Sequence, residues 1–222
     1  MKISIIIPVL NEAATLDRLL GDLQSLRQRG HEVMVVDGGG EHVSVQHCDD
    51  RIDRFVQTTA GRARQMRAGA RQSSGDIFWF LHADSVIPAQ ADRNIISACA
   101  TGGWGRFDVR LSGDHLLLRL VERLMNLRSR LSGIATGDQG IFVSRVLYRT
   151  VGGMPDLPLM EDIELSKRLK RLAPPQCLRT PLTTSSRRWE THGIVRTIVL
   201  MWLLRAAYAL GVPAQRLVSY YV

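Results

Sequence analysis

The 222-residue chain has 45% hydrophobic and 23% charged residues, values ordinary for a globular protein, so its composition excludes disordered and fibrous classes. Its 29 basic residues, nearly all arginine, outnumber 21 acidic ones. The resulting net charge of +8 favours anionic partners such as nucleotide diphosphates or lipid phosphates. The length fits one α/β domain better than two.

Cysteine usage and apolar runs indicate the compartment. The cysteines are odd in number and far apart, which favours reduced thiols in the cytosol over a disulfide framework or a zinc site: Cys48, Cys99 and Cys177. The first apolar run, Ile3 to Val9, is too short for a signal peptide, and the run from Ile198 to Leu210 is shorter than the roughly 20 residues of a bilayer span. We expect a cytoplasmic protein without a transmembrane helix.

The opening of the chain predicts a strand, a helix and a second strand. Ile3 to Val9 is a continuous β-branched run, typical of a parallel strand buried on both faces. We expect Asn11 to cap the next helix, whose leucine stripe can pack on a sheet, and Val33 to Val36 to form the next strand. Such a crossover is normally parallel, so the fold class is α/β with a mostly parallel, Rossmann-like sheet. The stripe consists of Leu16, Leu19, Leu20 and Leu23.

Later elements follow from periodicity and from glycine and proline positions. The C-terminal helix from Gly193 is apolar nearly all round and is therefore expected to be buried. Helices are predicted over 61–71, 88–100 (opened by Pro88), 115–131 and 161–171, strands over 77–81 and 107–111, a turn over 102–105, and a last short strand after Pro174-Pro175.

The helix over 115–131 is amphipathic and basic. A surface helix with a solvated arginine face is the plainer interpretation, and docking on anionic lipid at the inner face of the plasma membrane is the sharper one. Its expected apolar side is Leu117, Leu120, Val121, Leu124 and Leu131, and its expected basic side is Arg119, Arg123 and Arg130.

Polar residues follow the predicted strands, where parallel sheets bind ligands. Glu12 and Asp37 can accept hydrogen bonds from a base or ribose, and Gly38 lets a ligand approach the backbone closely, although Asp-Gly is also a common turn pair. Arg62 and Gln65 lie near a helix N-terminus, where free amides favour a phosphate. These residues predict a nucleotide site.

A metal site is predicted from His82-Ala83-Asp84. An alternating strand would place both polar side chains on one side, and Mg²⁺ or Mn²⁺ needs as few as one protein carboxylate when phosphates supply other ligands. Asp84 is the main candidate, His82 is secondary, and His192 is a third candidate.

Carboxylates and cations later in the chain predict the reaction site. Glu161-Asp162 opens a helix, where the dipole keeps a carboxylate ionised, so Asp162 can act as a base or simply cap the helix. The remaining candidates for contacts with the acceptor, the diphosphate or the sugar lie in a glycine-bracketed turn and in an arginine-tryptophan run: Asp138, Gln139, Arg187, Arg188 and Trp189.

Taken together, these motifs resemble the family 2 glycosyltransferases of the GT-A fold, especially a compact bacterial subgroup associated with arsenosugar biosynthesis. The matching motifs are Ile7 to Glu12, Val36 to Gly39, Gly61 to Ala63, Leu81 to Asp84, Gly137 to Gly140, Met160 to Asp162 and Arg187 to Trp189. The resemblance implies nucleotide contacts at Pro8, Asn11, Glu12, Asp37 and Arg62, metal and diphosphate at Asp84, and an inverting base at Asp162.

The resemblance further implies transfer of a sugar, of the hexosyl type, from a nucleoside-diphosphate sugar to an acceptor hydroxyl. It suggests a nucleotide-binding half over 1–100, an acceptor half over 101–190 and C-terminal helices over 191–222. Two departures stand out: the metal motif reads His-Ala-Asp where most relatives have Asp-x-Asp, and Ser185 replaces the glutamine of the Gln-x-x-Arg-Trp motif of processive synthases.

Two other classes remain open. Val35 to Gly40 is similar to the glycine-rich turn of S-adenosylmethionine-dependent methyltransferases, although there it follows the first strand. A non-catalytic module binding anionic membrane is the third hypothesis. Nucleic acid is not an expected partner, because the chain is only 6% aromatic and has no stacking array.

Overall fold

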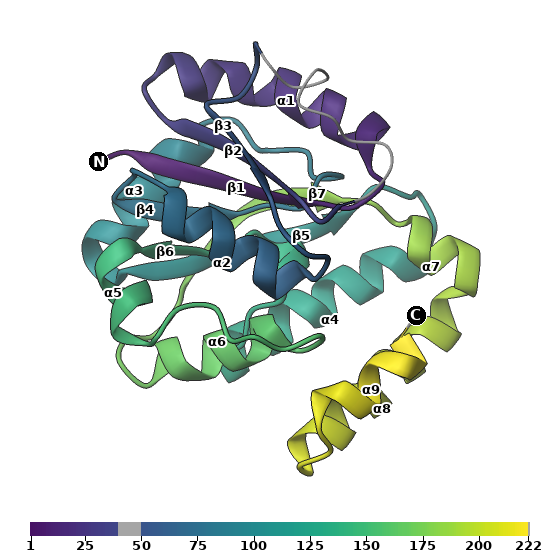
Figure 1. Cartoon of the computed structure of the whole chain (residues 1–222). Coiled ribbons are helices and arrows are strands. Elements are labelled where there is room, and N and C mark those ends of the chain that lie inside the picture. The colour runs from purple at the N-terminus through teal and green to yellow at the C-terminus, as the bar shows by residue number, and fades with distance from the viewer. Residues whose placement is uncertain (40–49, 222) are drawn as a thin grey trace.

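A seven-stranded sheet in the order β3-β2-β1-β4-β6-β5-β7 organises the molecule (Figure 1). The computed structural model describes residues 1–39 and 50–221, so Gly40 and Cys48 lie outside the described residues. The strands are β1 Ile3–Val9, β2 Glu32–Asp37, β3 Arg54–Gln57, β4 Ile77–Phe80, β5 Trp104–Leu111, β6 Phe142–Ser144 and β7 Gln176–Thr184. The helices are α1 Ala13–Gln28, α2 Arg62–Gln72, α3 Ala91–Gly102, α4 Leu116–Ser132, α5 Arg145–Thr150, α6 Glu161–Lys170, α7 Arg187–His192, α8 Ile194–Ala209 and α9 Ala214–Tyr221.

The N-terminal half confirms the predicted α/β class. Strands β3, β2, β1 and β4 are mutually parallel, and β1 is buried along its whole length. The predicted leucine stripe of α1 is buried against the sheet. Asn11 does not cap this helix, because it adopts a left-handed conformation with φ 57° and Glu12 takes the N-cap position without a side-chain hydrogen bond.

The second half makes the sheet mixed. Strand β6 runs antiparallel to both β4 and β5, while β7 runs parallel to β5. Three expectations are wrong here: α3 begins at Ala91, three residues after Pro88; Gly105 lies inside β5 and not in a turn; and the last strand, β7, spans nine residues. This position in β5 requires glycine, because a Cβ atom would collide with the Gln176 carbonyl oxygen of the neighbouring strand β7.

Helices cover both faces of the sheet (Figure 1). Helices α1 and α3 pack on one face, in a core that includes Trp79 and Phe107. Helices α2, α5 and α6 pack on the other face around Phe78 and Trp104. This arrangement brings the starts of α2 and α6 to the carboxyl ends of the parallel strands.

Helix α4 packs differently from the prediction. It buries Leu118 and Val121, whereas most of its expected apolar side is exposed, including Leu131 at 79%. Of the arginines expected in solvent, Arg119 donates to the Leu111 carbonyl oxygen at 2.6 Å and Arg130 bonds Asp108 at 2.6 Å. Two arginines therefore hold α4 against the sheet, and apolar residues face outward.

Helix α8 is not buried either. Only Thr197 and Leu204 of this helix are buried, and Trp202 is 69% exposed. The expectation that α8 must bury itself is therefore wrong, although α8 and α9 do pack on the start of α6 through Leu204 and Leu217. No helix of residues 1–39 or 50–221 has the length and hydropathy of a membrane span.

Candidate active site

A cavity of about 420 Å³ opens at the carboxyl ends of β1 and β4, the edge at which the sequence places its polar motifs. Residues from β1, α2, the segment after β4, α7, α8 and α9 line it. Among the predicted residues, the structure brings together Pro8, Glu12, Arg62, Gln65, His82, Asp84, Asp138, Arg188 and Trp189. Segments far apart in the sequence thus form one site.

Asp37 ends β2 beside Val9, which lines this cavity. Its side chain is almost fully buried, and its Oδ1 atom has no hydrogen-bond partner among the described residues. Leaving a buried carboxylate oxygen unsatisfied costs free energy, so it marks a place where a ligand donor can bind. Asp37 and Gly38 do not line the cavity directly.

Gln65 has a structural task that the sequence did not reveal. Its amide nitrogen donates to the carbonyl oxygens of Val9, at 2.7 Å, and Val36, at 2.8 Å, and thereby ties the ends of β1 and β2 together. Both donor hydrogens are therefore committed to the backbone. The predicted phosphate contact through this amide is wrong.

Arg62 places a positive charge at the centre of the cavity. Burial lowers the pKa of Arg62, but the negative charges of Glu161, whose Oε1 lies 3.7 Å from Nη1, and of Tyr221, Asp138 and Asp162 together outweigh this effect and raise it. Burial and the charge of Arg62 lower the pKa of neighbouring His82 to about 3. The site therefore presents a permanent cation beside a neutral imidazole at neutral pH.

Asp84 is the residue best placed to hold a divalent cation. It lines the cavity, and its side chain accepts a 3.4 Å hydrogen bond from the Thr184 hydroxyl. Burial, and then the charge of Asp84, raise the pKa of Glu12, a like-charge repulsion that a bound cation would relieve. The expectation that an alternating strand places His82 and Asp84 on one side is wrong, because both residues follow the end of β4. Both side chains nevertheless line the cavity.

The donor set is sparse, because no group of three or more His, Cys, Asp or Glu side chains within residues 1–39 and 50–221 could hold a metal on its own. A site that relies on one carboxylate and on substrate phosphates fits Mg²⁺ or Mn²⁺ chemistry. His192 is exposed at the end of α7 and does not line the cavity.

Asp162 lies at the start of α6, where it joins two parts of the site. Its Oδ2 accepts a hydrogen bond from the Gly137 backbone N–H at 2.8 Å, and its Oδ1 accepts one from the Ile163 N–H at 2.7 Å. Together with Glu161 and His82 it lines a small apolar void next to the main cavity. Both oxygens keep a free lone pair with which to accept a proton.

Three other predicted contacts lie away from the cavity. Gln139 is fully buried and closes a capping box with Thr136, so it is a structural residue and not an acceptor contact. Arg187 is exposed outside the cavity wall, although its charge still acts on Glu12. Asn11 does not line the cavity.

Tyr221 is a cavity residue that sequence reasoning missed. It ends α9, and its backbone carbonyl accepts a hydrogen bond from Arg188, whose guanidinium also lies 3.7 Å from the centre of its ring. Thr197 and Met201 of α8 complete the same wall. The periodicity of a short terminal helix carries no signal for such a long-range contact.

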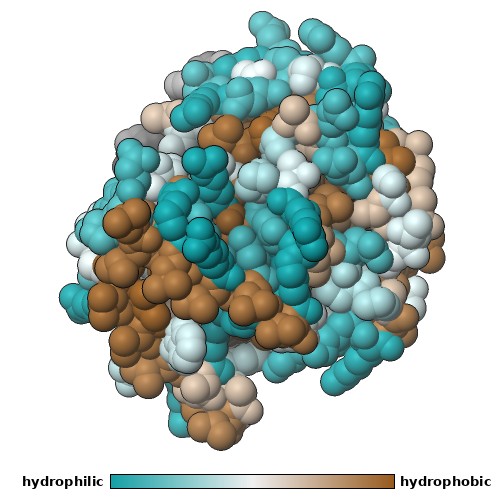
Figure 2. Space-filling view, turned by 180° about the vertical axis from the view of Figure 1, so that it is seen from behind, coloured by the Kyte–Doolittle hydropathy of each residue, from teal (hydrophilic) through white to brown (hydrophobic). Residues whose placement is uncertain are grey.

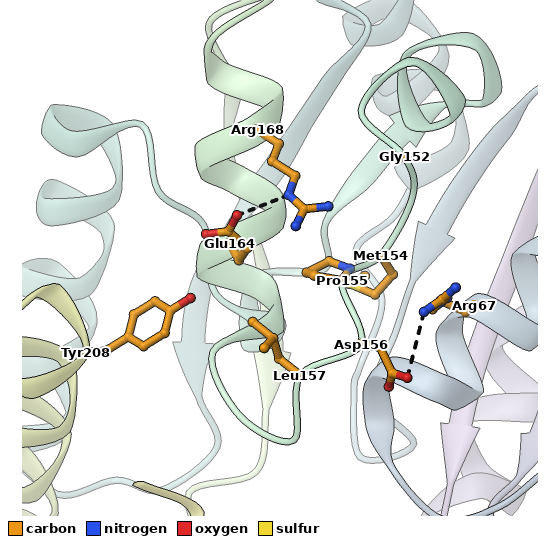
Figure 3. Close-up of a pocket in the computed structure, with 9 residues that line it drawn as sticks. All are labelled: Arg67, Gly152, Met154, Pro155, Asp156, Leu157, Glu164, Arg168 and Tyr208. Atoms are coloured by element: carbon orange, nitrogen blue, oxygen red, sulfur yellow. Dashed lines mark hydrogen bonds and ion pairs between the residues drawn. The ribbon is translucent and has the colours of Figure 1, made fainter. Parts of the chain in front are cut away.

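A second cavity of about 520 Å³ lies on the far side of α6 (Figure 3). The Arg168 side chain pairs with Glu164 at 3.1 Å, and that of Arg67 lies 3.9 Å from Asp156. Tyr208 of α8 forms the opposite wall. Its charges are balanced, unlike those of the first cavity.

Residues 4–103 match the profile of a family described as Glycosyl transferase family 2. This stretch runs from β1 to the end of α3 and contains the predicted nucleotide site. The match covers less than half of the chain, so it shows a likeness of this stretch to family 2 glycosyltransferases.

Individual relatives are distant. The chain is 22% identical over 191 residues to a β-monoglucosyldiacylglycerol synthase of Synechocystis sp., covering 76% of this chain and 40% of that protein. It is 28% identical over 155 residues to an undecaprenyl-phosphate 4-deoxy-4-formamido-L-arabinose transferase of Pseudomonas paraeruginosa, covering 62% and 44%. The chain thus spans less than half the length of these curated relatives.

Among solved structures, glucosyl-3-phosphoglycerate synthase from Mycobacterium tuberculosis, in complex with Mn²⁺, UDP and phosphoglyceric acid, has a TM-score of 0.63. Its sequence is 20% identical, and the match covers 96% of this chain and 79% of that one. A likeness at this identity shows the fold, here a GT-A-like α/β domain.

Burial, and then the charge of Asp162, raise the pKa of Glu161 to about 7, which makes folding stability depend on pH. Because the folded state holds this proton up to about pH 7 and the unfolded state loses it near pH 4.5, the contribution of Glu161 to stability falls as pH rises between those values. We expect the free energy of unfolding of the wild type, minus that of Glu161→Gln, to decline across this window in urea titrations. A difference independent of pH would contradict the raised pKa.

Proposed function

We propose that the protein is an inverting glycosyltransferase that moves a sugar from a nucleoside-diphosphate sugar to an acceptor hydroxyl. The observation that carries this proposal is that Asp162 lines a small void which shares His82 with the cavity that contains Arg62, Arg188 and Asp84. Such a site pairs a base with groups that can hold a diphosphate. One relative is named as a monoglucosyldiacylglycerol synthase and the other as an arabinose transferase, and the solved neighbour is in complex with UDP.

The reaction is a single displacement. Asp162 takes the proton of the acceptor hydroxyl while that oxygen attacks the anomeric carbon. The bond from this carbon to the diphosphate breaks, and its electron pair leaves with the nucleoside diphosphate. Arg62 and Arg188 stabilise the charge that develops on the leaving group.

The two halves of the fold divide the work. Residues 1–100, with Pro8, Glu12 and Asp37, hold the nucleotide, and the segment 101–190 supplies the base and the acceptor surface. Helices α8 and α9 close the cavity. The finer resemblance, to the subgroup associated with arsenosugar biosynthesis, is supported by the order of the motifs alone.

We further propose that the diphosphate is bound through Mg²⁺ or Mn²⁺ held by Asp84. The support is chemical: a cavity carboxylate beside Glu12, with phosphate oxygens of the donor to complete the ligand set. When bound, the ion neutralises charge on the leaving group.

A second proposal is peripheral attachment to an anionic membrane at the cytoplasmic face. Figure 2 shows hydrophobic side chains gathered on the face seen from behind, at the lower left. The exposed apolar residues of α4 and α8 form this patch: Leu116, Leu117, Leu120, Leu124, Leu127, Leu131, Val195, Val199, Trp202 and Leu203. Residues 194–221 contain arginines and no aspartate or glutamate side chain. This charge favours binding to an anionic bilayer over binding to a partner protein whose surface carries both acidic and basic residues.

Asp162→Asn tests the base. The variant keeps the shape and loses the proton acceptor, so we expect the transfer rate to fall by roughly 10² or more. The melting temperature should fall only modestly, because the amide oxygen can accept just one of the two backbone hydrogen bonds that the carboxylate accepts. The assay needs a working donor and acceptor pair. Glu164→Gln, two residues further along the same helix and facing the second cavity, is the matched control and should turn over normally. Near-normal turnover in Asp162→Asn would transfer the role to Glu161 or Asp138.

Asp84→Ala tests the metal. A nucleoside diphosphate should raise the melting temperature of the wild type more with Mn²⁺ or Mg²⁺ than with chelator, because ligand binding stabilises the folded state. The variant should lose this metal-dependent increment, and Asp22→Ala on exposed α1 should keep it. An unchanged increment in Asp84→Ala would exclude this carboxylate as the ligand.

Trp202→Ser combined with Leu203→Ser tests the membrane patch. Burying each side chain in lipid contributes about 1.5–3 kcal/mol, so the double variant should pellet at least roughly tenfold less with phosphatidylglycerol vesicles. Val146→Ser, an equally exposed apolar change on α5, is the control. Equal sedimentation of all three proteins would rule out this surface.

A further inference from the structure

Two arginines at the seam between α4 and α8 have no counter-ion. Among the described residues, neither the Arg128 nor the Arg205 guanidinium forms a hydrogen bond or ion pair, and the Nη2 atom of Arg128 is buried without a partner. Arginine is almost never withdrawn from water in this way unless something satisfies it. Most other arginines packed against the sheet, such as Arg106 and Arg130, have carboxylate partners.

Helix geometry places this pair between the two cavities. On α8, Met201 lines the cavity of about 420 Å³ proposed to bind the sugar donor, hereafter the donor cavity, and Tyr208 lines the second cavity. Arg205 lies four residues after Met201 and three before Tyr208, so it is on the same side of the helix. On α4, Arg128 follows Met125 by three residues, and Met125 packs in the cluster that joins α4 to α8. Both arginines therefore point into the seam, from opposite helices.

The charges around the seam favour an anion. Burial, and then repulsion from Arg205, lower the pKa of Arg128 to about 10, and Asp162 opposes this shift. A ligand carrying negative charge would relieve the repulsion between these two positive charges. The influence of Asp162 shows that the seam lies within electrostatic range of the proposed base.

We propose that Arg128 and Arg205 form a binding site for a phosphate group of the acceptor at the seam between α4 and α8. Two guanidinium forks can hold a phosphate through several charge-assisted hydrogen bonds. The apolar patch of α4 and α8 flanks the seam, so the phosphate belongs either to a lipid headgroup or to a free phosphate ester. The role as an acceptor site rests on the proposed glycosyl transfer, whereas phosphate binding itself does not.

The test is equilibrium binding of inorganic phosphate at fixed ionic strength, without donor or turnover. Arg128→Gln and Arg205→Gln should each weaken binding roughly tenfold, the loss of a hydrogen bond to a charged group. Their melting temperatures without phosphate should be equal to or above that of the wild type, because an unpaired cation has been removed. Arg18→Gln, on exposed α1, is the charge-matched control and should bind normally.

Arg62→Gln separates this site from the donor cavity. Phosphate held between Arg128 and Arg205 should still bind to Arg62→Gln, whereas phosphate held in the donor cavity would be lost there and kept in the two seam variants. Failure of nucleotide binding would therefore leave the seam result standing. Undiminished phosphate binding in both seam variants would overturn the proposal.

A second arm distinguishes the sources of the phosphate. The proteins are sedimented with vesicles of phosphatidylcholine alone and with phosphatidic acid added. A selective, roughly tenfold loss of binding to the phosphatidic acid vesicles in the seam variants supports a lipid headgroup. Equal vesicle binding, together with weaker binding of inorganic phosphate, supports a soluble phosphate ester.

Discussion

The contact between Arg62 and Glu161 is the interaction on which the site depends. It joins the first residue of α2 to the first residue of α6, across 3.7 Å and at the edge of a sheet that both helices cover from one face. A carboxylate buried as deeply as Glu161 is costly without a cation, and a cation in a cavity is costly without an anion. Each helix start therefore supplies what the other needs.

This exchange has a chemical consequence. Arg62 stays charged, and burial together with this charge keeps His82 neutral, so the cavity wall holds a permanent cation beside a neutral imidazole. Glu161, being partly protonated near neutral pH, leaves Asp162 as the carboxylate with the stronger hydrogen-bond support from backbone amides. Neighbouring acids in one helix turn thus have different environments and can take different roles.

Local pattern was sufficient for the core and insufficient for the surfaces. The stripe of α1 has one period and one buried face, and β1 and β2 are runs buried on both faces, so the sequence predicts them correctly. Helix α4 carries leucines on two faces, and which face is buried depends on hydrogen bonds from Arg119 and Arg130 that no periodicity encodes.

The same limit applies to the site. Motif order predicted nine of the residues that line the cavity, because parallel strands bring their ends together. Gln65 and Gln139 look like ligand contacts in the sequence, yet their amides satisfy buried backbone groups, which only the folded neighbourhood determines. Tyr221 and the unpaired Arg128 likewise depend on how distant helices meet.

The position of Tyr221 also matters for anyone who handles this protein. The Tyr221 carbonyl and ring both contact the Arg188 guanidinium at the wall of the donor cavity. A polypeptide fused after Tyr221 would therefore begin beside the proposed nucleotide site. Met1 is exposed on the opposite side of the molecule (Figure 1). An affinity tag, a fluorophore or a surface tether is therefore better attached at the amino terminus, where it leaves the cavity open.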